Sequence, residues 1–90
     1  MSYLWRPRQQ VDDWFNDQDD NDLVMVVLHW LMDFCEAPEP YPSLWFEGEP
    51  VPRQYAPITG TRLILTFAIT HDPDIVHGLK LEDEGGVWTP

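Results

Sequence analysis

Along the first part of the chain, apolar residues recur with the period of an α-helix. Val11, Trp14 and Phe15 stand at positions i, i+3 and i+4, so they share one side of a helix over residues 8–17. The aspartates of this segment fall off that side. The pattern therefore predicts a short amphipathic helix that packs its aromatic side against the rest of the molecule.

A second helix is predicted over residues 22–36. A polar stretch precedes it, in which Asp20, Asn21 or Asp22 can supply the oxygen that caps its first turn. The segment is apolar nearly all round, which is typical of the most buried helix of a small domain. Its valines also suit a strand, and we favour the helix because of the length of the run and its cap. The prolines of residues 38–42 then end it in an extended connector.

From residue 43 onward the pattern changes to the two-residue period of β-strands. Turn-forming residues divide it into four predicted strands, residues 44–46, 53–58, 62–71 and 75–82. The third is apolar on both sides, which indicates the middle of the sheet. To bury the apolar residues of the last two strands on one face, Ile69 must lie opposite Leu79 and Phe67 opposite Leu81. That register requires a bulge or a longer loop between the two strands.

These elements predict an α+β fold, with two N-terminal helices packed on one face of a three- or four-stranded antiparallel β-meander. A chain of 90 residues has room for one core, so we expect a single domain over residues 1–90. It would consist of a helical acidic front over 1–36, a sheet over 43–82 and a flexible tail over 83–90. The expected core contains Trp14, Phe15, Val27, Leu31, Leu65, Phe67, Ile69 and Leu79.

Charge restricts the possible functions more than any motif does. The chain has 16 acidic residues against 5 basic ones, a formal charge of -11 at pH 7, and no Lys or Arg between Arg8 and Arg53. Binding to nucleic acid or to an anionic membrane depends on Lys and Arg, so we expect neither. The longest apolar run, residues 23–32, is shorter than the roughly 20 residues of a membrane span. With no signal-peptide pattern and a single cysteine, Cys35, the chain is expected to be cytoplasmic.

The acidic residues are the first candidates for function. The helix dipole explains those that precede the second helix, but it disfavours Asp12, Asp13 and Asp17 in the C-terminal half of the first. Carboxylates one helical turn apart have nearly the spacing of phosphates along a nucleic-acid strand. This pattern predicts a small acidic protein-binding module or inhibitor, a nucleic-acid mimic of anti-defence or immunity type. It would cover the basic, nucleic-acid-binding surface of a partner protein through Asp12, Asp13, Asp17, Asp19, Asp20, Asp22, Glu47 and Glu49.

Two plainer explanations of the acidity stay open. The carboxylates can be an ordinary solvated surface, or the host can be adapted to salt so that its proteome is acidic throughout. Five Trp in 90 residues argue against the second explanation. Trp is also a common anchor of protein interfaces.

A metal site is the next candidate. His71, Asp72, Asp74 and His77 offer two imidazoles and two carboxylates around one turn, which suit zinc, manganese or iron. Asp-Pro-Asp is also ordinary turn chemistry, and we expect neither a metal nor another cofactor. Acidic neighbours should raise the pKa of the Cys35 thiol. Because no catalytic motif is present either, we assign no catalytic residue and do not expect an enzyme.

The alternative is a small metal-dependent or toxin-like enzyme. Two helices followed by a strand meander resemble, in element order, the ribosome-dependent and gyrase-directed toxins of toxin–antitoxin pairs. The resemblance implies that such a role would use Arg53, Tyr55 and Arg62 on adjacent strands, while a metal-dependent reaction would use His71 and His77. Those toxins are typically basic, so this alternative ranks below the acidic binding module.

Overall fold

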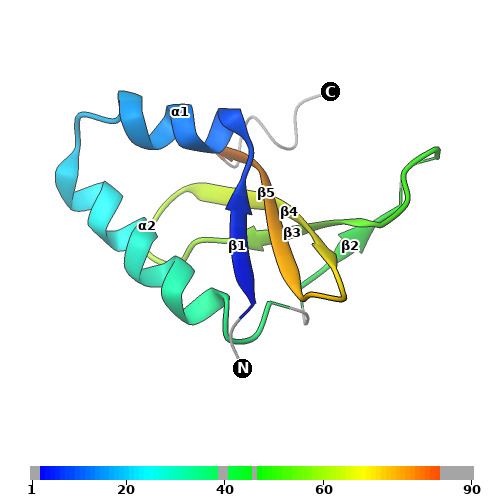
Figure 1. Cartoon of the computed structure of the whole chain (residues 1–90). Helices are drawn as coiled ribbons and strands as arrows, with labels where there is room; N and C mark the ends of the chain where they lie inside the picture. The colour runs from blue at the N-terminus through cyan, green and yellow to red at the C-terminus, as the bar shows by residue number, and fades with distance from the viewer. Residues whose placement is uncertain (1–2, 39–40, 46, 84–90) are drawn as a thin grey trace.

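The computed structural model describes residues 3–38, 41–45 and 47–83 (Figure 1). Seven elements follow one another along the chain: β1 (Leu4–Pro7), α1 (Gln9–Asp17), α2 (Asn21–Phe34), β2 (Ser43–Leu44), β3 (Arg53–Pro57), β4 (Leu63–Thr70) and β5 (Ile75–Asp83). Residues 84–90 of the predicted tail, 39–40 of the connector and Phe46 of the first predicted strand lie outside the described residues.

The five strands form one mixed sheet in the order β1-β5-β4-β3-β2. β1 runs parallel to β5, and the other neighbours are antiparallel. The predicted α+β class and its two N-terminal helices are confirmed. The predicted meander of three or four antiparallel strands is wrong, because a fifth strand precedes the helices and adds a parallel pair.

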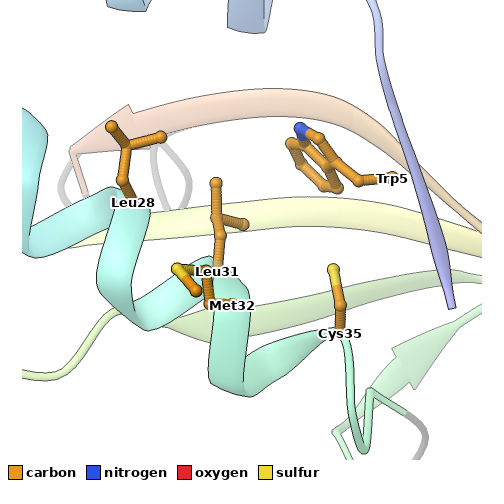
Figure 2. Close-up of a pocket in the computed structure, with 5 residues that line it drawn as sticks. All are labelled: Trp5, Leu28, Leu31, Met32 and Cys35. Carbon is orange, nitrogen blue, oxygen red and sulfur yellow. The ribbon is translucent and has the colours of Figure 1, made fainter. Parts of the chain in front are cut away.

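The strand that the sequence did not predict is β1. It has four residues, ends in a proline and carries no clear alternation, so its local pattern is weak. Its position comes from long-range pairing with the free edge of β5, where Trp5 is the Cα partner of Val76. Trp5 points from β1 toward α2 (Figure 2).

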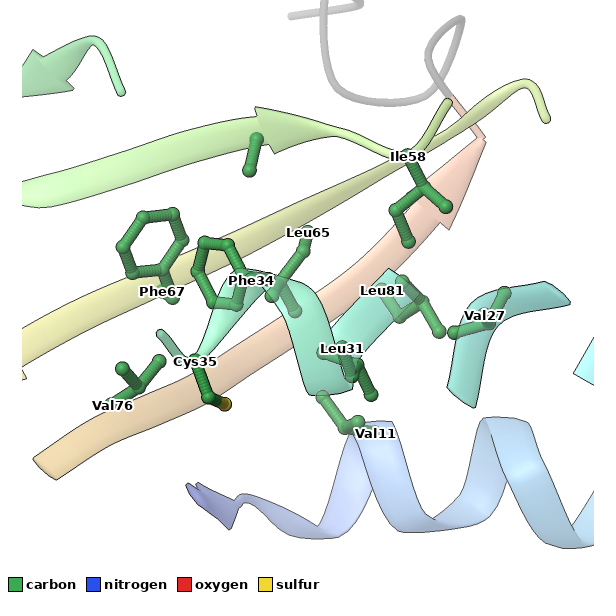
Figure 3. Close-up of a cluster of buried hydrophobic side chains, with 11 residues drawn as sticks. Val11, Val27, Leu31, Phe34, Cys35, Ile58, Leu65, Phe67, Val76 and Leu81 are labelled. Atoms are coloured by element: carbon green, nitrogen blue, oxygen red, sulfur yellow. The ribbon is translucent and has the colours of Figure 1, made fainter. Parts of the chain in front are cut away.

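The core lies between the two helices and one face of the sheet, which we call the core face (Figure 3). α1 contributes Val11, and α2 contributes Val27, Leu31 and Phe34. Of the predicted core, Val27, Leu31, Leu65 and Phe67 are buried, whereas Trp14, Phe15 and Ile69 are partly buried against the cluster. Leu79 was wrongly predicted: it lines a pocket on the opposite side of the sheet.

The register of β4 and β5 also differs from the prediction. Ile69 pairs with Val76 and Phe67 with Gly78, and an irregularity between Thr66 and Phe67 leaves Leu79 without a partner in the ladder. A bulge or a longer loop was expected, and the structure has a bulge, but the register differs from the predicted one. The extra residue of the bulge shifts the alternation of side chains along β5 by one. Even-numbered residues before the bulge and odd-numbered residues after it therefore both point to the core face.

Trp5 lies directly over the backbone of Gly78. A Cβ atom placed on Gly78 would stand 2.4 Å from Cη2 of the Trp5 indole, a distance at which one of the two must move. Gly78 is itself buried opposite Phe67. Glycine at this position therefore lets the indole close the core beside the edge strand.

Two hydrogen-bonding side chains fix the helices. The amide of Gln10 in α1 donates to the carbonyl oxygen of Leu81 (3.1 Å) and accepts from its N–H (2.9 Å), which ties α1 to β5. Of the three possible caps of α2, Asp20 is the one used: its Oδ1 accepts from the N–H of Leu23 at 3.1 Å. The Asp20 carboxylate thus satisfies one of the N–H groups that have no partner within the helix.

The contact between Trp5 and Gly78 predicts a non-additive pair of substitutions. Gly78→Ala should lower the free energy of unfolding by about 1–3 kcal/mol, because its methyl group collides with the indole. In a Trp5→Ala background the same substitution should cost much less, since the collision is gone. Urea denaturation of the four proteins measures both costs. Equal costs in the two backgrounds would show that the indole does not restrict Gly78.

The cap of α2 can be tested against a neighbouring aspartate. Asp20→Ala should destabilise the protein by about 1 kcal/mol, because the N–H of Leu23 loses its acceptor. Asp19→Ala removes the same charge from an exposed residue that does not cap the helix, and should change stability by less than about 0.5 kcal/mol. Thermal unfolding of both variants would contradict the assignment if their melting temperatures fell equally.

Candidate functional site

The eight carboxylates predicted to bind a partner do not form one surface. Six lie on α1, on the connection to α2 or on its first turn, and all six are exposed: Asp12, Asp13, Asp17, Asp19, Asp20 and Asp22. The other two, Glu47 and Glu49, lie in the connection between β2 and β3. That connection extends from the opposite end of the molecule to the α1–α2 junction (Figure 1). The structure therefore separates the predicted site into two groups.

Three of these carboxylates already have partners within the chain. Asp13 accepts a hydrogen bond of 2.7 Å from Nε2 of Gln9, and Asp20 caps α2. Glu49 is only partly exposed and forms an ion pair with the guanidinium of Arg53. The guanidinium also donates a hydrogen bond to the Glu49 carboxylate, and this bond is the main cause that raises the pKa of Arg53 above its ordinary value. Local structure thus explains part of what the sequence attributed to a partner.

The histidines of the β4–β5 hairpin bind different partners. Nδ1 of His71 lies 2.6 Å from Oδ1 of Asp74 within the turn, whereas Nε2 of His77 lies 2.8 Å from Oγ1 of Thr70. Across residues 3–38, 41–45 and 47–83, no three His, Cys, Asp or Glu side chains gather as metal ligands would. The hairpin does not bring its four potential ligands together.

The second face of the sheet, opposite the helices, collects basic residues instead. We call it the outer face. Because Trp5 and Val76 point to the core face, their neighbours Arg6 and His77 point to the outer face, where Ala68 pairs with His77. On β3, Gln54 and Ala56 are buried on the core face. Arg53 and Tyr55, which alternate with them, therefore lie on the outer face. Lys80 is the partner of Thr66 on this face.

A pocket of about 190 Å³ opens on the outer face. It is lined by Arg8, Glu49, Pro50, Val51, Ala68, Thr70, His77 and Leu79. Arg8 precedes α1, and its backbone N–H is held by the carbonyl oxygen of Gly78 at 2.8 Å. The pocket thus combines one guanidinium, an imidazole held by a hydroxyl, and a carboxylate already paired with Arg53. The guanidinium of Arg8 and the hydroxyl of Thr70 can donate to an anionic ligand, whereas the Glu49 carboxylate can only accept.

The outer face and the helices carry opposite charge. Four of the five Lys and Arg of the chain lie on or at the outer face: Arg6, Arg8, Arg53 and Lys80. Residues 9–38, which contain both helices, have eight acidic residues and no Lys or Arg. Glu49 and Glu82 pair there with Arg53 and Lys80, so the positive charge left on this side of the sheet comes from Arg6 and Arg8, and the net charge of the chain conceals it.

The residues of the toxin-like alternative are only partly together. Arg53, Tyr55 and His77 share the outer face. Arg62, by contrast, precedes β4, its side chain is 77% exposed, and its Nε lies 3.8 Å from Oδ2 of Asp83. Sequence reasoning missed Arg8 and Thr70. The position of Arg8 depends on the unpredicted β1, and the contact between Thr70 and His77 depends on the register next to the hairpin turn, in which Ala68 pairs with His77.

The thiol of Cys35 does not add a nucleophile to this site. Burial is the main cause that raises its pKa, and the neighbouring charge of Glu36 raises it further. The cysteine lies at the end of α2, on the core side of the sheet. A neutral thiol in that position contributes to packing.

None of the helices that the structure describes has the length and hydropathy to cross a membrane. No protein-family model matches the sequence, and no curated protein matches it either.

A solved structure does match the fold. The chain is similar to a chain of the archaeal RelE–RelB complex from Pyrococcus horikoshii OT3, with a TM-score of 0.72 and 16% sequence identity, over 94% of this chain and 98% of that one. This likeness contradicts the predicted nucleic-acid mimic, and it fits the toxin-like alternative in part. The prediction rested on carboxylates counted along the sequence, in which the basic residues that the fold brings to the outer face are far apart. At this identity the likeness establishes the fold: the protein has the architecture of a chain from that complex.

Proposed function

We propose that this protein is the toxin-like member of a toxin–antitoxin-type pair, held in a complex with a second protein and acting on an anionic target through its outer face. The fold likeness supports the type of protein, because it extends over nearly the whole of both chains. The element order of the sequence points the same way. The outer face supplies the surface for the target.

The observation that carries the proposal is the gathering of basic residues. A chain with a formal charge of -11 places four of its five Lys and Arg around one sheet face and its pocket. Exposed charges more than a Debye length apart, about 8 Å at physiological salt, are largely screened from one another. An anion at the outer face therefore responds mainly to nearby charges, which besides the basic residues include Glu49 in the pocket and Asp12, one helical turn from Arg8.

We propose that the outer face binds its target and that the chain is not an enzyme. The pocket is lined by one imidazole, His77, whose Nε2 is engaged by Thr70. The lining offers guanidinium and hydroxyl donors, which are binding groups. Arg8 would hold the anion, while Arg53 neutralises Glu49 at the edge of the pocket.

Growth arrest on induced expression in a bacterial host tests this function. The wild-type chain should stop growth, and Arg8→Gln should relieve the arrest, since loss of a charged hydrogen bond weakens binding by about tenfold or more. Arg62→Gln is the matched control, because it removes the same charge from an exposed arginine outside the pocket. Expression levels and melting temperatures of the three proteins should be equal.

Two results would contradict the proposal. One is normal growth with the folded wild-type chain present at high level. The other is equal relief by Arg8→Gln and Arg62→Gln, which would show that overall charge matters and that the pocket does not.

A further inference from the structure

Helix α2 has a second apolar side that faces solvent. Met25, Leu28 and Met32 stand at positions i, i+3 and i+7, so they form one stripe, which we call the α2 strip. Their exposed fractions are 50%, 41% and 71%. The core-facing side of the same helix is filled by other residues, so the α2 strip is not needed to pack the helix on the sheet.

The α2 strip continues into a pocket of about 200 Å³ between α2 and β1 (Figure 2). Leu28 and Met32 belong to both, and Trp5, Leu31 and Cys35 complete the lining. An apolar cavity of about 150 Å³ can bind benzene, so this volume is sufficient for one large apolar side chain. Pockets of this kind next to an apolar surface are where anchor residues of a partner bind.

The surroundings of the α2 strip are acidic. Asp22 and Asp33 are exposed on the same helix, one turn before Met25 and one residue after Met32. Among the described side chains, neither takes part in an ion pair with Lys, Arg or His. Two copies of this surface placed together would bring four such carboxylates into contact. Charge therefore favours a basic partner over a second copy of the chain.

We propose that the α2 strip and its pocket bind an amphipathic helix of a partner protein, whose apolar side inserts one large side chain against Trp5 and whose flanks carry Lys or Arg. The inference rests on the proposed function, because it names the surface and the partner class of that complex. An apolar helix face in a groove supplies affinity, and the charged flanks fix the partner's orientation. This surface differs from the predicted carboxylate row, since apolar contact is its centre.

A displayed library of helical peptides, randomised at apolar and charged positions, tests the surface without knowledge of the partner. Selection on the wild-type protein should enrich helices with an apolar stripe flanked by Lys or Arg. Met32→Asp should weaken the best purified peptide at least about tenfold, because it places a charge in the apolar contact. Met25→Asp, at a second exposed position, should act in the same direction. Both variants should keep the wild-type melting temperature.

Leu44→Asp is the matched control. Leu44 is 54% exposed on β2, at the other edge of the sheet, and undergoes the same substitution. It should leave peptide affinity unchanged. The inference is overturned if no helix is selected, if the selected flanks are acidic or uncharged, or if Leu44→Asp weakens binding as much as Met32→Asp does.

Analytical ultracentrifugation of the wild-type chain tests whether a second copy of the chain covers the α2 strip. A dimer that Met32→Asp dissociates would assign the α2 strip to a second copy and overturn the proposal, whereas a monomer agrees with it. Growth arrest by the wild type together with a failed selection would overturn this inference and leave the proposed function. Selection of a specific basic helix without growth arrest would overturn the proposed function and leave this inference.

Discussion

The packing of the Trp5 indole on Gly78 is the contact on which the rest of the architecture depends. It holds β1 against β5 as a parallel edge strand, where only a glycine allows the close approach. A hydrogen bond of 2.9 Å from the N–H of Tyr3 to the carbonyl oxygen of Cys35 then joins the start of β1 to the end of α2. The same indole forms a wall of the pocket beside the α2 strip. One contact therefore closes the core, orders the sheet and shapes a binding surface.

The position of β1 also determines where positive charge accumulates. Arg6 on β1 and Arg8 directly after it come to the outer face because β1 pairs with β5: Arg6 is the partner of His77, and the N–H of Arg8 donates to the carbonyl oxygen of Gly78. Across the sheet, Arg53 reaches the same face from β3 and is held by Glu49. Residues far apart in sequence thus form one basic surface, while most of the acids lie on the helical layer and in the connections; on β5, Glu82 pairs with Lys80. Such segregation gives a strongly acidic protein two surfaces of different chemistry.

The sequence predicts the two helices and the last strands well, because their signals are local. Val11, Val27 and Leu31 lie where a period of 3.6 places them, and the apolar β4 lies inside the sheet. β1 and the register of β5 escape prediction, since four residues ending in Pro7 carry little pattern and the bulge at Leu79 reverses the alternation. The site depends on both, so counting charges along the chain indicated the acidic surface and missed the basic one.

The two surfaces lie on opposite sides of β5 and meet at one strand position. Trp5 lines the pocket of the α2 strip and covers Gly78, and the residues that flank Gly78, His77 and Leu79, line the pocket of the outer face. A side chain that displaces the indole would remove the packing that fixes this part of β5. Displacement on one side would therefore change the support of His77 on the other, through a single layer of backbone. Coupling of this kind requires that the indole has two packed positions, because a densely packed core does not deform continuously.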